Sequence, residues 1–140
     1  MAKIVKSTSI DAPIEKVFSY VEEPANVPEY WPSVTEVKDV QSLPGGGFKY
    51  RWVYKMAGVR FEGGTETTEF VVNERTVSEN SGGVSGTVTW TYEPEAGKTK
   101  VTFEAEYFVH VPLLRGLAES FLVKLNRQEA EAILANVKAQ

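Results

Sequence analysis

Residues 48–56 have the sequence FKYRWVYKM, in which large apolar or aromatic side chains alternate with mostly charged ones. Successive side chains of a β-strand point to opposite faces, so this period of two predicts a strand with one aromatic face. The members of that face are Phe48, Tyr50, Trp52, Tyr54 and Met56. The opposite face, which we expect to be mostly in contact with water, consists of Lys49, Arg51, Val53 and Lys55.

The same alternation recurs on both sides of this stretch. The turn sequence LPGGG at residues 43–47 separates it from an expected strand that begins at Val34. Further strands are expected over residues 59–73, with a bend or bulge at Gly63-Gly64, and over residues 76–81, 84–93 and 101–109. Their short connections predict an antiparallel meander.

Helical patterns occur near the two ends of the chain. Residues 3–10 form an expected first strand, and Pro13 then opens a helix whose apolar face includes Phe18. Three prolines restrict residues 23–33 to a short helical turn. From Pro112 onward, apolar residues recur at helical spacing to the C-terminus. We therefore predict an α+β fold over residues 1–140 as a single domain: a seven-stranded antiparallel sheet curled around a long C-terminal helix, with two short helices after the first strand.

Composition excludes several classes of function. The formal net charge is −4, and the 15 Lys and Arg residues form no run, so nucleic acid is not an expected partner. No apolar stretch is long enough to span a membrane and none resembles a secretory signal, so a soluble cytoplasmic protein is expected. The chain has no Cys and one His, which leaves carboxylates as the main metal ligands, and we expect neither a metal nor another cofactor.

Four segments carry a resemblance to a known family. They are SIDAPIEKVF at residues 9–18, Trp31-Pro32, TVTWTYEP at residues 87–94 and Leu113-Leu114. In the order of its elements and in these motifs the chain resembles the START-like helix-grip (SRPBCC) superfamily, particularly its small polyketide cyclase/dehydrase and lipid-transport branch. The resemblance implies a cavity between the sheet and the C-terminal helix. It specifies an activity poorly, because carriers, cyclases and receptors share the fold.

The aromatic face of the third strand has two interpretations, ordinary core packing and cavity lining. The resemblance favours cavity lining, and the flat tyrosine and tryptophan side chains suit a ring-bearing or acyl ligand. The expected ligand-binding residues are Phe48, Tyr50, Trp52, Tyr54, Thr67, Trp90, Tyr92, Phe103, Tyr107, Leu117, Phe121 and Leu125.

Catalytic candidates are fewer. If the phase of the strand after residue 59 persists, Glu69 points inward, whereas a one-residue slip at the glycine pair turns Glu66 inward instead. A lone inward glutamate would have a raised pKa and could exchange protons near neutrality. His110 is expected at the rim or outside, and Arg115 is expected to face solvent near the cavity mouth.

Three functions stay open on this basis. The first is a carrier or sensor for a small hydrophobic molecule such as a lipid, an acyl compound or an aromatic polyketide. The second is a cyclase or dehydratase with an inward Glu or Tyr. The third is an interaction domain with a filled core, either a monomer or a dimer. An inward ionisable residue beside tyrosine donors favours the enzyme, and a cavity without one favours the carrier.

Overall fold

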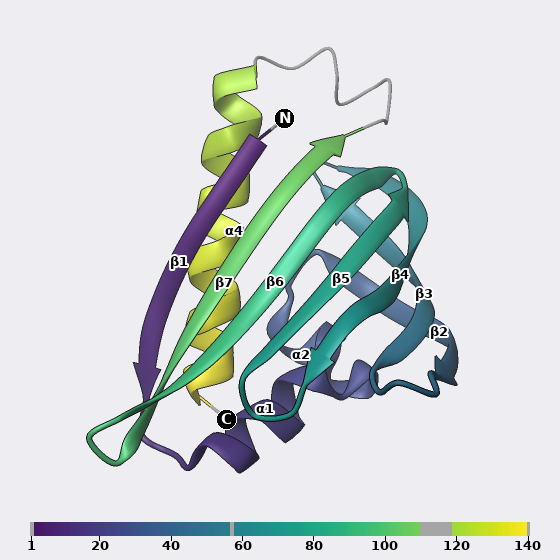
Figure 1. Cartoon of the computed structure of the whole chain (residues 1–140). Helices are drawn as coiled ribbons and strands as arrows, with labels where there is room; N and C mark the ends of the chain where they lie inside the picture. The colour runs from purple at the N-terminus through teal and green to yellow at the C-terminus, as the bar shows by residue number, and fades with distance from the viewer. Residues whose placement is uncertain (1, 57, 110–118, 140) are drawn as a thin grey trace.

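A computed structural model describes residues 2–56, 58–109 and 119–139 of the chain (Figure 1). Within these residues, a strongly curved sheet wraps one face around a long helix, and short helices close one end (Figure 1). The elements in chain order are β1 (Ala2–Ile10), α1 (Ile14–Glu22), the 3-10 helix η1 (Pro24–Asn26), α2 (Val27–Tyr30), β2 (Val34–Ser42), β3 (Phe48–Met56), β4 (Val59–Val71), β5 (Arg75–Gly82), β6 (Val84–Glu95), β7 (Lys98–Val109) and α4 (Glu119–Ala139).

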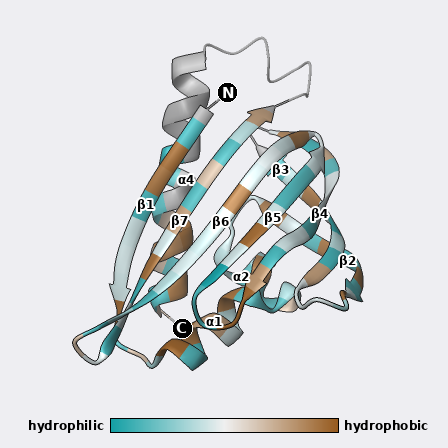
Figure 2. Ribbon diagram, viewed as in Figure 1, coloured by the Kyte–Doolittle hydropathy of each residue, from teal (hydrophilic) through white to brown (hydrophobic). Residues whose placement is uncertain are grey.

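The described strands form one seven-stranded sheet in the order β1-β7-β6-β5-β4-β3-β2, and every pairing is antiparallel. Strands β2 to β7 are sequential neighbours, which confirms the predicted meander. β1 joins the far side of β7, with Ile4 opposite Ala105. Apolar and polar residues alternate along the strands (Figure 2), so one face of the sheet supplies the core.

Helix α4 packs along β1 on the inner side of the sheet (Figure 1). Its buried residues include Ile133, Leu134 and Val137. Two polar contacts position it: Lys6 Nζ lies 3.2 Å from Glu131 Oε1, and Asn136 Nδ2 donates to the backbone carbonyl of Tyr30 at 3.1 Å. The predicted C-terminal helix is thus confirmed from Glu119. Its expected first residues, 112–118, lie outside the described part of the chain.

Helix α1 closes one end of the sheet. Pro13 precedes its first turn in an extended conformation, and Val17, Phe18 and Val21 form its buried face, as the sequence predicted. The Phe18 ring packs edge-on against Tyr92 of β6, with ring centroids 5.1 Å apart. This contact fixes α1 against the inner face of the sheet.

The register of β4 differs from the expected one. Pairing with β3 runs without a shift through Gly63, which lies opposite Trp52, and Gly64, so no bulge occurs there. The irregularity lies in the pairing with β5, between Thr67 and Glu69. Gly63 instead serves packing, because a Cβ at this position would lie 2.4 Å from the Trp52 indole.

One residue of the outer face of β3 also departs from expectation. The alternation places Val53 among the side chains that face water, but it is only 1% exposed. The charged neighbours Lys49, Arg51 and Lys55 are in contact with solvent, as expected. The outer face of β3 is therefore polar at three of these four positions.

Candidate functional site

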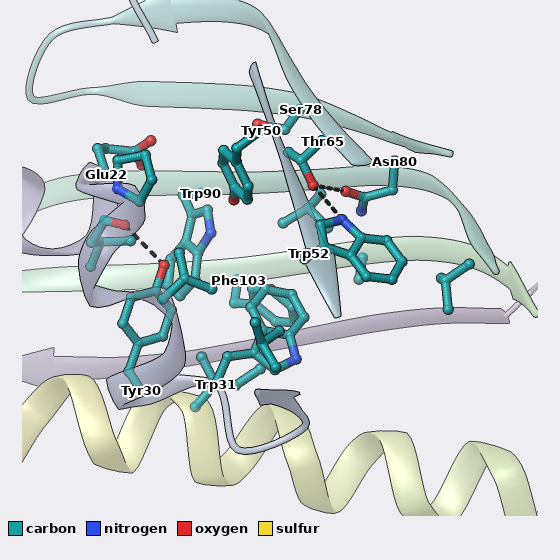
Figure 3. A pocket seen from close by; sticks show the side chains of 18 of the residues that line it. Glu22, Tyr30, Trp31, Tyr50, Trp52, Thr65, Ser78, Asn80, Trp90 and Phe103 are labelled. Carbon is teal, nitrogen blue, oxygen red and sulfur yellow. Dashed lines mark hydrogen bonds between the residues drawn. The ribbon is translucent and has the colours of Figure 1, made fainter. Parts of the chain in front are cut away.

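A cavity of about 120 Å³ lies between the concave face of the sheet, the α1–α2 segment and α4 (Figure 3). Nine of the 23 described lining residues are aromatic, and Ile133 of α4 contributes to the wall from the helix. The described lining residues are Ile4, Val21, Glu22, Pro24, Val27, Tyr30, Trp31, Val34, Phe48, Tyr50, Trp52, Tyr54, Thr65, Thr67, Ser78, Asn80, Val84, Val88, Trp90, Phe103, Ala105, Tyr107 and Ile133.

The aromatic wall is built from rings that meet at edges or tilted angles. Phe103 of β7 lies at its centre, with ring centroids 5.0 Å from Trp90 and 5.5 Å from Trp31. Tyr30 approaches Trp90 edge-on at 6.0 Å, and Trp52 lies 5.8 Å from Tyr54. Such arrangements bring ring edges against ring faces, which favours each pair by about 0.5–1.5 kcal/mol beyond area burial. These rings form two groups, and the indole N–H of Trp31 links them by donating a hydrogen bond to the Tyr54 hydroxyl at 3.3 Å.

A polar patch crosses β3, β4 and β5 in the same cavity. The indole N–H of Trp52 donates to Thr65 Oγ1 at 2.9 Å, and the Thr65 hydroxyl donates to Asn80 Oδ1 at 2.5 Å (Figure 3). Ser78 and Thr67 lie in the same wall. Hydroxyl and amide groups in an otherwise apolar pocket are the groups that orient a ligand and give specificity.

A second polar group lies at the α1 end of the cavity. Glu22 is the last residue of α1, and its carboxylate points to the sheet rather than to solvent. Its Oε2 accepts a hydrogen bond from the Tyr92 hydroxyl at 2.5 Å and another from Thr76 Oγ1 at 2.8 Å. Thr76 is 1% exposed and Tyr92 is 3% exposed, so this carboxylate is anchored in the core.

Burial determines the electrostatics at Glu22. It raises the pKa of Glu22 above its ordinary value of 4.5, and the hydrogen bonds from Tyr92 and Thr76 oppose that rise. Burial likewise raises the pKa of Tyr50 to about 12, and the pKa values of Tyr30 and Tyr92 well above 10. These three phenols therefore remain protonated near neutrality. The Tyr30 hydroxyl donates to the Val21 carbonyl at 2.9 Å, and the Tyr92 hydroxyl donates to Glu22.

The structure brings most of the expected ligand-binding residues together. The members that line the cavity are Phe48, Tyr50, Trp52, Tyr54, Thr67, Trp90, Phe103 and Tyr107. Tyr92 lies behind the wall, between Phe18 and Glu22, and supports the site through its hydroxyl. Leu117, the rim candidates His110 and Arg115, and the side chains of Phe121 and Leu125 lie outside what the structure describes.

The two carboxylates expected at an inward position of β4 are on the surface, and this expectation is corrected. Glu66 is exposed beside Lys49, with 3.8 Å between the charged atoms, and Glu69 is exposed beside Arg75 at 3.5 Å. The phase set by Phe61 persists through Thr67, and the register shift before Glu69 then turns Phe70 toward the core. Neither carboxylate reaches the cavity.

Glu22 is not one of the expected site residues, although the sequence contains a signal for it. Glu22 follows Phe18 by four residues and Ile14 by eight, so helical spacing places it on the apolar face of α1. A glutamate in the last turn of a short helix usually belongs to its solvated side. The inward orientation of Glu22 is therefore indicated by its helical spacing from Phe18 and Ile14, and not by its residue type.

Among the described residues, no group of three or more His, Cys, Asp or Glu side chains gathers. No helix in the described part of the chain is long and apolar enough to span a membrane. The groups that the described cavity wall offers to a ligand are its rings, its hydroxyl and amide groups, and the Glu22 carboxylate.

Comparison with known proteins identifies the family. Residues 1–140 match the model of the family described as "Polyketide cyclase / dehydrase and lipid transport". The chain belongs to this family, which confirms the resemblance found in its motifs. None of the curated proteins matches the sequence.

Solved structures share the fold at low sequence identity. A protein from Thermus thermophilus is 22% identical, with a TM-score of 0.85, and the match covers 99% of this chain and 95% of that one. A START superfamily protein from Mycobacterium smegmatis is 14% identical, with a TM-score of 0.81 and coverages of 98% and 94%. The Zhui aromatase/cyclase from a Streptomyces species is 12% identical, with a TM-score of 0.81 and coverages of 99% and 92%. These likenesses place the chain in the START-like helix-grip fold.

Proposed function

We propose that this protein binds a small, ring-bearing hydrophobic molecule in the cavity between the sheet and α4, as a carrier or a sensor. The observation that carries the proposal is the cavity itself: a space of about 120 Å³ whose wall is rich in aromatic side chains. A well-packed core leaves few voids larger than a water molecule, so an interior of this size is not ordinary packing. The open interior also argues against an interaction domain with a filled core.

The dimensions and chemistry of the cavity favour a compact ligand. An apolar cavity of about 150 Å³ holds a benzene molecule, so the present space of about 120 Å³ is on the scale of a single ring. The aromatic wall accommodates the ring, whereas the patch around Thr65 and Asn80 at one side and Glu22 at the other offer hydrogen bonds to substituents. A ligand with an apolar body and few polar atoms matches this distribution.

The tryptophans of the chain provide the test. All three, Trp31, Trp52 and Trp90, line the cavity, so a bound molecule contacts the chromophores that dominate intrinsic fluorescence. We expect saturable changes in emission on titration with single-ring compounds such as propylbenzene and 2-phenylethanol. Native mass spectrometry of the purified protein, followed by extraction, identifies any ligand that co-purifies.

A pair of variants separates cavity binding from surface effects. Ala105→Leu adds side-chain volume inside the cavity and should weaken binding at least about tenfold, with thermal unfolding as the check on folding. Val5→Leu makes a smaller addition at an exposed position of β1 and should leave binding unchanged. Unchanged emission with every compound, together with a ligand-free native mass, would contradict the proposal.

A second function, an enzyme of the cyclase or dehydratase type, is favoured by one observation. Glu22 lines the cavity beside the phenol of Tyr92, and its raised pKa suits proton exchange with a bound substrate. One structural relative, the Zhui protein, is named an aromatase/cyclase. Turnover of a co-purified compound by wild-type protein, with kcat lost in Glu22→Gln and binding retained, is the result that selects the enzyme.

A further inference from the structure

The described wall of the cavity has an unbalanced charge pattern. Glu22 is its single carboxylate, and no Lys, Arg or His is among the described lining residues. In that part of the chain, no cationic side chain forms an ion pair with Glu22. The groups that face it are hydroxyls: Tyr92 from β6 and Thr76 from β5 donate to it, and the phenols of Tyr30 and Tyr50 add electrostatic interactions.

The hydrogen bonds to Glu22 are also unevenly distributed. Both donors, Tyr92 and Thr76, bind Oε2. Within the described residues, Oε1 receives no hydrogen bond. A carboxylate has about four acceptor sites, so half of the group is occupied by the protein and the other oxygen retains its full capacity.

The location of Glu22 makes the ability of its Oε1 to accept hydrogen bonds relevant to ligand binding. Figure 3 shows Glu22 at the end of the cavity to which Tyr30 and Trp90 also belong. Glu22 Oε1 is not among the fully buried polar atoms that lack a partner, so this oxygen remains accessible from the cavity that Glu22 lines. The described residues bond the other oxygen only. A group of the ligand is the natural partner for Oε1.

We propose that Glu22 anchors the polar end of the ligand, and that the ligand therefore presents a hydrogen-bond donor, a hydroxyl or a protonated amine, to Oε1. This inference rests on the proposed binding function and narrows its ligand class. An alcohol or phenol gives one O–H to the carboxylate. An ammonium group adds charge pairing and lies among the aromatic faces of Tyr30 and Trp90, which favour cations. A carboxylate ligand, in contrast, meets a like charge in a site with no described cation.

A comparison of probes that differ only in their polar group tests the proposed class of ligand. Isothermal titration calorimetry at pH 7 compares four probes with the same phenylethyl body: 2-phenylethanol, 2-phenylethylamine, the methyl ether of 2-phenylethanol, and 3-phenylpropionate. The ether keeps the oxygen of the alcohol and loses its donor. We expect the alcohol to bind at least about tenfold more tightly than the ether, and the amine at least about tenfold more tightly than the carboxylate, as for hydrogen bonds to charged groups.

Variants assign the preference to Glu22. Glu22→Gln removes the charge at almost constant shape and should reduce the preference of amine over carboxylate at least about tenfold. Glu22→Met removes the acceptor altogether and should abolish the preference of alcohol over ether. Glu15→Gln, at an exposed position of the same helix, is the matched control and should leave all four affinities unchanged.

The outcomes separate this inference from the proposed function. Equal binding of alcohol and ether by the wild-type protein, or tighter binding of 3-phenylpropionate than of the amine, overturns the donor requirement and leaves the binding function standing. These wild-type comparisons need no variant to fold. Absence of binding by all four probes and by propylbenzene contradicts the binding function itself.

Discussion

The hydroxyl of Tyr92 donates a hydrogen bond to the carboxylate of Glu22 at 2.5 Å, although the two residues are 70 positions apart in the sequence. This bond joins β6 to the end of α1, at the boundary between the packed end of the core and the cavity. It holds the only described acidic side chain of the cavity wall in place. The first two predictions therefore concern this pair.

Tyr92→Phe should lower the free energy of unfolding at pH 7 by about 1–3 kcal/mol, because Glu22 loses a donor and the phenyl ring keeps the packing against Phe18. Urea denaturation measures the change. Tyr20→Phe is the control, since the Tyr20 hydroxyl is buried without a hydrogen-bond partner in the described residues and its loss should cost nothing. Equal destabilisation by the two substitutions would contradict the role assigned to Tyr92.

The pH dependence of stability should carry the signature of Glu22. Because burial raises its folded-state pKa above 4.5, the folded chain retains a proton that the unfolded chain releases as pH rises past that value. The contribution of Glu22 to the free energy of unfolding is therefore greatest at low pH. It declines as pH rises from about 4.5 through the raised folded-state pKa, and is constant above it.

Glu22→Gln removes this titration. The free energy of unfolding of wild type minus that of Glu22→Gln should decrease as pH rises from about 4 to about 8 in urea denaturation series. Parallel curves for wild type and Glu22→Gln would show that the pKa of Glu22 is the same in the folded and unfolded states.

Gly63→Ala should destabilise the fold by about 1–3 kcal/mol, because the new methyl group would lie 2.4 Å from both the Trp52 indole and the Ser81 carbonyl oxygen. Its neighbour provides the control: a Cβ at Gly64 meets its nearest atom at 3.4 Å. Gly64→Ala should therefore change stability by less than about 0.5 kcal/mol. Thermal unfolding with tryptophan fluorescence reports both stability and the environment of Trp52, and equal effects would refute this packing account.

Glu66→Gln and Glu69→Gln should leave ligand binding unchanged and alter stability by at most about 1 kcal/mol, because both side chains form exposed ion pairs on the outer face. Calorimetry with 2-phenylethanol, alongside Glu22→Met, measures the contrast. A loss of binding in Glu69→Gln would contradict the placement of this side chain outside the ligand site.

The fold could be predicted well because alternation is a property of local residues. Trp52 and Trp90 each belong to long runs with a period of two, and both line the cavity as their phase requires. The expected inward position of Glu69 is wrong because the register shift after Thr67 is a backbone irregularity that alternation does not encode. Helical spacing from Phe18 indicates the inward position of Glu22, but the sequence could not predict its partners Thr76 and Tyr92, because they lie far away in the chain.

The pairing of β1 with β7 has a consequence for how the chain folds. Ile4 finds its partner Ala105 about a hundred residues later, and α4, which packs on β1, is later still. During synthesis from the N-terminus, β1 therefore leaves the ribosome before any part of its native neighbourhood exists. The meander from β2 to β7 can assemble from successive hairpins, whereas β1 can pair only after β7 has been synthesised. Final closure of the molecule then depends on a long-range encounter whose entropic cost grows with the length of the loop.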